Sequence, residues 1–425
     1  MPSLLPEVYI KKQDISILLK YCSGYDIIPS MINENKNILF LILTNCINKV
    51  FDVFMAVFVI SFLFNHTDDI VQIGIYNIVC GLVVGALAYL TGNWLKRGSR
   101  LLMYKIGIVA TFLFMCAFVF FRDAIVSHLV LFGALYGVMM AFKSFPNNLI
   151  RAESISGPNL IKFQGYNEAM KNIVRIGAPV VLGFFLTMDS YFRTVEFLAI
   201  LALAEFVVFS QIKIAPQRAK KRFELKKVAN QWRAIPILKY LDWAEFCRGA
   251  TVDGALGTLI TVYAAYLFKT DLNLGILGSA FYIVSIVLNF LFGRICKSHH
   301  FVKILLLSGA MSILSVLLFI IVPDMASFIF YNFCFTVAVA FVRIIEDINI
   351  IKISYLPKIA PRRVEYFAMR ELILCFGRFF GYGIMIVVGI FGSFVLLKYL
   401  LLGLTLFLCI MCISCARMSH NIADK

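Results

Sequence analysis

Charged residues are scarce in this sequence. They make up 15% of its 425 residues, whereas hydrophobic residues make up 61% and the mean hydropathy is +0.87. A soluble protein of this length needs a polar surface, and so little charge cannot provide one. The composition therefore argues against a soluble protein and predicts one whose solvent is lipid.

Histidine is also sparse, and cysteine follows no recognisable pattern. The five histidines lie in loops or at the edges of apolar segments, and the eleven cysteines show no paired spacing in polar loops. Cys409, Cys412 and Cys415 share helical spacing but have no histidine or carboxylate with them, so we interpret them as packing residues rather than metal ligands. The sequence contains no His-x4-Asp motif, no Gly-x-Ser-x-Gly motif and no phosphate-binding glycine loop. We therefore expect no cofactor, no metal and no enzymatic activity, such as acyl or glycosyl transfer.

Long apolar runs fill the chain after a polar segment, residues 1–36, that does not resemble a cleavable signal peptide. Each run is long enough to cross a bilayer as a helix, and lipid-exposed backbone must be helical or part of a closed barrel. We predict an all-α polytopic membrane protein with twelve transmembrane helices, at about 37–64, 70–90, 101–121, 125–149, 165–187, 194–212, 244–268, 275–292, 302–322, 326–351, 370–390 and 395–415.

The net charge of +16 comes from basic residues in short loops beside these spans, which is not the pattern of a nucleic-acid-binding face. Nearly all of them fall on one side, and only Arg122, Arg193, Lys269 and Lys398 fall on the other. The positive-inside rule places both termini in the cytoplasm. We divide the chain into a cytoplasmic segment 1–36, a six-helix bundle 37–213, a basic linker 214–243, a second six-helix bundle 244–416 and a cytoplasmic tail 417–425.

The two bundles repeat each other at an offset of about 200 residues. The matched pairs are Asp52 with Asp253, Lys143 with Arg343, Asn147 with Asp347, Gly177 with Gly377, and Gly183 with Gly383. An even number of spans in each half gives the two repeats the same orientation, so they relate by an axis along the membrane normal.

Six plus six spans, cytoplasmic ends and a long basic central loop resemble the major facilitator superfamily over the whole chain from about residue 37. The loop after span two matches the family signature in kind at Gly92, Lys96, Arg97, Gly98 and Arg100, but Leu95 stands where an aspartate is expected. Span five carries Gly177, Pro179 and Gly183, a loose form of the antiporter motif of drug exporters. The plainer interpretation of these three residues is a proline kink with small residues for helix contact.

Charges inside the spans are candidates for function, because each costs roughly 2.5–3.5 kcal/mol to insert. The resemblance implies that spans one, four, seven and ten line a central cavity. In span one, Asn45, Asn48, Lys49 and Asp52 share one helical face. We expect this face to line the pathway; the alternative is a Lys49–Asp52 ion pair that only packs helices.

Span seven carries Asp253, with Arg248 and Glu245 nearer the cytoplasm. Asp253 lacks a base as close in sequence as Lys49 is to Asp52. A carboxylate in a cavity of low dielectric holds a proton more readily, so we predict Asp253 as the proton-carrying group.

Further charges lie towards the cytoplasmic ends of the spans. Lys143 is in span four and Arg343 in span ten. We predict an inner gate of ion pairs between the halves, formed by Glu346, Asp347, Glu168, Lys171, Arg175, Arg370, Glu371 and Arg378. The alternative for most of them is ordinary charge at helix ends. Arg343 and Arg378 also have the chemistry to meet an anionic substrate.

These observations lead us to expect a secondary active transporter that works by alternating access and is coupled to protons. Our first choice is a monomer in the plasma membrane that exports small amphipathic or lipid-like compounds. One alternative is a proton- or cation-coupled importer of an organic anion that uses Lys49, Lys143, Arg343 and Arg378. Another is a non-transporting receptor or scaffold on the same fold, in which neutral replacement of the buried charges would be tolerated.

Overall fold

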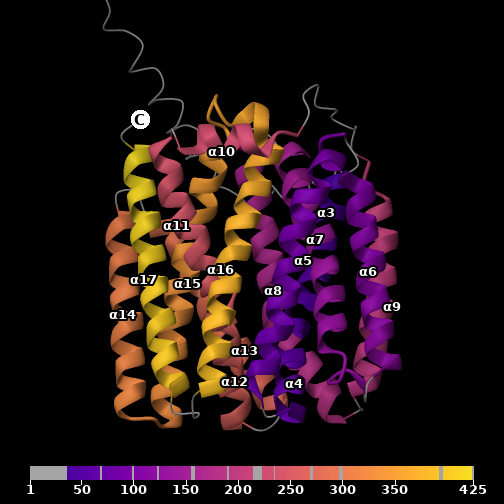
Figure 1. The fold of residues 1–425 in the computed structure, drawn as a ribbon, viewed down its shortest axis with the longest axis vertical. Helices are drawn as coiled ribbons and strands as arrows, with labels where there is room; N and C mark the ends of the chain where they lie inside the picture. Colours follow the sequence, from indigo (N-terminus) through magenta and orange to yellow (C-terminus); the bar gives the residue numbers. More distant parts are fainter. Residues whose placement is uncertain are drawn as a thin grey trace, which may run out of the picture.

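The computed structural model describes residues 36–67, 69–97, 100–121, 124–154, 158–188, 191–213, 223–233, 235–268, 271–295, 300–391 and 396–423. Within these ranges the secondary structure is helical, with no strand, and most helices run side by side along one direction (Figure 1). The all-α prediction is confirmed.

Each of the twelve predicted spans coincides with one helix or with two or three consecutive helix segments in this part of the chain. The first six correspond to α3 (Lys36–Val53) with η1 (Phe54–Val59) and α4 (Ile60–Thr67), α5 (Ile70–Lys96), α6 (Arg100–Phe120), α7 (Leu129–Ser154), α8 (Pro158–Met188) and α9 (Tyr191–Ser210). The last six correspond to α11 (Pro236–Ala250) with α12 (Ala255–Phe268), α13 (Asp271–Ile295), α14 (Phe301–Ile321), α15 (Met325–Ser354), α16 (Arg363–Phe391) and α17 (Leu396–Ala423).

Nine helical segments among the described residues are long and apolar enough to cross a membrane. The three predicted spans outside this set are α8, α9 and α13, although α13 contains the shorter apolar stretch 275–288. In α9 the reason is visible in the sequence, since its 20 residues include Arg193, Glu196 and Glu205.

Two further elements lie between the predicted spans. The linker contains a short helix, α10 (Leu225–Arg233), and α11 begins at Pro236, inside the region that we assigned to the linker. A single 3-10 turn, η4 (Ala360–Arg362), precedes α16. In Figure 1, α10 lies across the end of the bundle at which α17 ends, and we refer to this as the α10 end.

The helices of the first six spans gather on one side of the bundle and those of the last six on the other, with α13 placed beside α8 (Figure 1). The halves meet where α5 packs along α16 and α8 packs along α13. Small residues allow this approach. A Cβ atom at Gly74 of α5 would lie 2.5 Å from Ile386 of α16, and one at Gly275 of α13 would collide with the carbonyl oxygen of Pro179.

Candidate functional site

Spans one and seven lose their regular helical geometry close to the two carboxylates that the repeat pairs. Asp52 is followed by Val53 and the π-helix η1, whereas Asp253 lies in the irregular segment 251–254 between α11 and α12. Gly254 allows this break, because a Cβ atom there would collide with the carbonyl oxygen of Gly249. π-Helical turns and broken helices in membrane proteins occur often at functional sites.

Three arginines surround Asp253. Its Oδ2 lies 2.7 Å from Nε of Arg248, and its Oδ1 accepts a hydrogen bond from Arg343 of α15. Nε of Arg378, from α16, donates to the backbone carbonyl of Asp253 over 3.2 Å. The prediction of Asp253 as the proton carrier relied on the lack of a base as close in sequence as Lys49 is to Asp52. In the structure two guanidinium groups nevertheless contact its carboxylate, one of them from another helix.

Arg248 connects Asp253 to a further buried carboxylate, and a second ion pair lies in the same half. Nη1 of Arg248 lies 3.0 Å from Oε2 of Glu346, whose side chain is fully buried. Arg370 Nε donates to Oε1 of Glu245 over 2.6 Å. We predicted Arg370 and Glu346 as members of a gate between the halves. The ion pairs that they form here instead join helices of the C-terminal half.

In the N-terminal half, Lys49 and Asp52 form an ion pair with a distance of 3.0 Å between Nζ and Oδ2, and 45% of the Asp52 side chain is exposed. Asn45, also on the predicted face, donates to Oδ1 of Asn167 in α8 over 2.8 Å and accepts from Asn147 of α7 over 2.9 Å. The face therefore has a buried end that joins spans one, four and five and an accessible end that carries opposite charges.

Lys143 does not line an open pathway, because its side chain is buried in the N-terminal half between α6 and α9. Its Nζ lies 2.7 Å from Oε2 of Glu205 and 3.3 Å from Oγ1 of Thr111, and it sits over the ring of Phe51 at 4.9 Å from the centroid. The Tyr104 hydroxyl donates to Oε1 of Glu205 over 3.1 Å.

Asn48, which we placed on the face of span one, contacts this cluster through a hydrogen bond to the Tyr104 hydroxyl. Sequence reasoning missed Glu205, which is fully buried. The signal was present, since a carboxylate inside an apolar span is a functional candidate wherever it occurs.

An ion pair between Lys96 at the end of α5 and Glu365 near the start of α16 links the two halves at the α10 end. Both side chains are buried, at 5% and 1% exposure. Lys96 was singled out as part of the loop motif, whereas Glu365 was not. Leu95, which replaces the expected aspartate, is fully buried.

The remaining residues of the loop motif and of the predicted gate differ in their exposure. Arg97 is exposed and Arg100 is buried, whereas Gly98 lies outside the described residues. Arg175 donates to Oδ1 of Asn172 over 2.9 Å within α8. The remaining members of the predicted gate are Lys171 and Glu371, which are half-buried, Asp347, which is exposed, and Glu168, whose side chain lies outside the described part.

The segment of span five with the loose antiporter motif forms part of the contact between the halves. Pro179 packs against Gly275 and Gly278 of α13, Gly183 is buried, and no atom lies within 4 Å of a Cβ position at Gly177. This placement agrees with the interpretation of the motif as a helix-contact element.

A helical bundle with two repeated halves and ion pairs inside its spans is characteristic of multi-pass membrane transporters. A family model described as the Major Facilitator Superfamily matches residues 41–382, and the chain belongs to this family. A curated relative, the uncharacterized protein YqgE of Bacillus subtilis, is 24% identical over 354 residues, which cover 82% of this chain and 81% of that protein.

Three solved structures share the fold. The nucleoside transporter NupG matches with a TM-score of 0.62 and 13% identity over 90% of this chain and 100% of its own. The xylose transporter XylE from E. coli matches with a TM-score of 0.61 and 13% identity over 88% and 97%. A bacterial homologue of the iron transporter ferroportin, in an inward-facing state, matches with a TM-score of 0.59 and 16% identity over 89% and 97%. At these identities the similarity is one of fold alone.

Proposed function

We propose that this chain is a secondary active transporter that moves a small solute by alternating access and is coupled to protons. The observation that carries the proposal is the pair of carboxylates, Asp52 and Asp253, at matching positions of spans one and seven. Asp52 lies just before a π-helical segment, and Asp253 lies within a break of the helix. Substrate and ion sites of membrane transporters lie at such interrupted helices between the repeats. The two carboxylates are also partly accessible, with 45% and 19% of the side chain exposed.

The contacts of Asp253 suggest how a proton and a solute are coupled. Arg248 and Arg343 both contact its carboxylate, so a proton taken up there would compete with two ion pairs. Protonation therefore requires the arginines to turn to other groups. Glu346 is one acceptor within reach of Arg248, and its Oε1 has no hydrogen-bond partner within the described structure. Asp52, which pairs with Lys49, is the more accessible of the two carboxylates.

For the solute and the direction, our first choice is export of small amphipathic or lipid-like compounds across the plasma membrane. The support is Gly177, Pro179 and Gly183 in span five, of which Pro179 lies at the contact with α13. A proline-containing segment at this contact suits a motion of one half against the other. We also propose cytoplasmic termini and a monomer, in line with the distribution of basic residues and the self-contained pair of halves.

A specific observation favours the second candidate, an importer of an organic anion. The Arg343 side chain is 33% exposed and its Nε has no partner among the described residues. An arginine that meets Asp253 with one part of its guanidinium can bind a carboxylate with the rest. Of the other three basic residues assigned to this candidate, Lys49 and Lys143 are engaged by Asp52 and Glu205. The third, Arg378, donates to the backbone carbonyl of Asp253.

Transport into sealed vesicles of each orientation tests the proposal. A panel of amphipathic dyes and small organic acids is offered under an imposed pH gradient, with and without a protonophore. Accumulation of an amphipathic compound only in inside-out vesicles, and only with the gradient, supports proton-coupled export. Accumulation of an organic acid only in right-side-out vesicles supports the importer instead. Unchanged distribution of every compound, together with full tolerance of neutral residues at positions 52 and 253, would favour the receptor or scaffold.

A further inference from the structure

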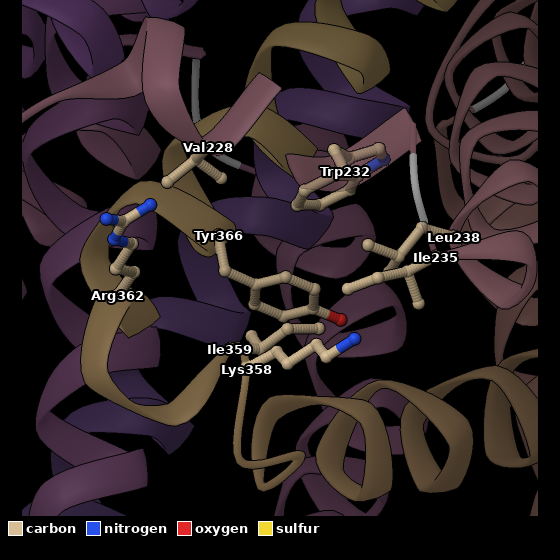
Figure 2. A pocket seen from close by; sticks show the side chains of 8 residues that line it. All are labelled: Val228, Trp232, Ile235, Leu238, Lys358, Ile359, Arg362 and Tyr366. Carbon is tan, nitrogen blue, oxygen red and sulfur yellow. The ribbon is translucent and has the colours of Figure 1, made fainter. Parts of the chain in front are cut away.

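The linker contacts both halves of the protein at the α10 end. We call residues 223–232 the strap. Its C-terminal end is bound to the C-terminal half, where Trp232, 4% exposed, stacks on Tyr366 of α16 with ring centroids 5.4 Å apart. The indole Nε1 donates to Oδ1 of Asp242 in α11 over 2.7 Å. Figure 2 shows Trp232 and Tyr366 in an apolar pocket with Val228 and Ile359.

The N-terminal end of the strap contacts the other half. The ring of Phe223 lies on Gly92 of α5, so closely that a Cβ atom at Gly92 would be 2.5 Å from two ring carbons. Gly92 is part of the loop motif that the sequence singled out, and here its missing side chain makes room for an aromatic ring from the linker. Phe223 is held less firmly than Trp232, because its ring is only half-buried and has no polar atom with which to form a hydrogen bond.

The Phe223 contact lies beside the ion pair between the halves. The backbone N–H of Glu224 is 3.4 Å from Oε1 of Glu365, the same oxygen that receives Lys96. A carboxylate from α16 thus meets a lysine from α5 and the backbone of the strap. When α5 and α16 separate at this end, the two contacts to α5 must break, namely Lys96 with Glu365 and Gly92 with Phe223. The contact of the strap with Glu365 lies within the C-terminal half and can persist.

We propose that the strap is a latch that holds the α10 end closed, with Trp232 as its fixed anchor and Phe223 as its releasable end. The chain passes from Trp232 to α11 within a few residues, so Trp232 moves with the C-terminal half. Opening at this end then carries Phe223 away from Gly92, while the stacking on Tyr366 persists. The inference rests on the proposed alternating access, but it requires neither a particular solute nor proton coupling.

Cys375 provides a readout that needs no substrate. It lies on α16 against α5, with its Sγ 3.6 Å from the Cβ position of Gly85, and it is 9% exposed. Separation of α5 and α16 at the α10 end exposes it to water. The experiment measures the rate at which a water-soluble maleimide modifies Cys375 in lipid nanodiscs, followed by peptide mass spectrometry so that the other cysteines do not interfere.

Phe223→Ala removes the releasable contact. We expect modification of Cys375 to become roughly fivefold faster, because the closed state loses the stabilisation that a half-buried aromatic ring provides. Gly92→Ala displaces the ring and should have the same effect. The double variant should be no faster than either single one, because both act on one contact. Trp94→Ala is the matched control, since Trp94 is on the same helix, 54% exposed and two residues from Gly92.

Lys96→Ala distinguishes a wrong latch proposal from a wrong proposal of alternating access, because it breaks the ion pair between the halves and leaves Phe223 in place. If Lys96→Ala accelerates modification and Phe223→Ala does not, the halves move but the strap is no latch, and the inference is overturned. If no variant changes the rate, the separation of α5 and α16 is itself contradicted, and the latch with it. Equal acceleration by Trp94→Ala would also overturn it, by showing a general loosening of α5.

Discussion

The buried pair of Lys143 and Glu205 offers a sharp test of how the N-terminal half is held together. Nζ and Oε2 are 2.7 Å apart, and the two side chains are 8% and 0% exposed. Glu205→Gln leaves the ammonium group of Lys143 in the bundle without a counter-charge. Loss of one partner of a buried ion pair costs about 3–5 kcal/mol, so we expect a loss of that order in the free energy of unfolding.

Removal of both charges should be far less harmful. In the double variant Lys143→Met, Glu205→Leu, apolar side chains of similar volume fill the space, and replacement of a buried pair in this way is often neutral. The Tyr104 hydroxyl loses its acceptor, at a cost of about 1–3 kcal/mol. We therefore expect the double variant to be more stable than Glu205→Gln, although it removes more contacts.

Denaturant unfolding in detergent micelles, compared among the wild type, each single variant and the double variant, measures this coupling. Single losses below about 1 kcal/mol, or losses that simply add in the double variant, would refute the argument from burial. Transport by the double variant then separates two roles of Lys143. Full transport assigns it to packing, whereas a stable but inactive double variant returns it to the pathway, as the sequence suggested.

Two further predictions concern stability away from the charges. Gly249→Ala should destabilise the C-terminal half by about 1–3 kcal/mol, because its Cβ would collide with the carbonyl of Leu374 in α16. Gly383→Ala should not destabilise it, because no atom lies within 4 Å of the added Cβ. Denaturant unfolding in micelles compares the two variants. Asp324→Ala should increase hydrogen exchange in the first turn of α15, because its carboxylate accepts from the backbone N–H of Ser327 over 2.7 Å. This bond to the Ser327 N–H lowers the pKa of Asp324, so its contribution is present above the ordinary aspartate pKa and lost only as the pH falls through the lowered one.

Much of the fold was predictable because lipid leaves few choices. An apolar run of sufficient length must form a helix in a bilayer, and this alone places helices at all the predicted spans. The start of α11 was not predictable in the same way. Pro236 begins it eight residues before the position that we expected, because Lys239 and Asp242 make its first turns too polar for a hydropathy argument. The break at 251–254 also escaped prediction, since its cause is a close backbone approach at Gly254.

The site was predictable in its residue types but less so in its pairings. Helical periodicity placed Lys49 and Asp52 on one face, and their ion pair agrees with it. Arg248 and Asp253 are five residues apart, a spacing that is unfavourable in a regular helix, and only the break brings them together. The surroundings of Lys143 could not be predicted either. The sequence identifies a charge in span four, but it does not show which neighbouring helices the side chain faces.

Proton flux in proteoliposomes is the most direct test of proton-coupled transport through Asp253. A solute that drives proton movement through the wild type is compared in Asp253→Asn, Asp52→Asn and the control Glu196→Gln, which alters an exposed carboxylate on α9. We predict that Asp253→Asn abolishes the solute-driven proton flux and that Glu196→Gln preserves it. Undiminished flux in both aspartate variants would contradict the claim, and would leave the two carboxylates as structural groups in a transporter fold.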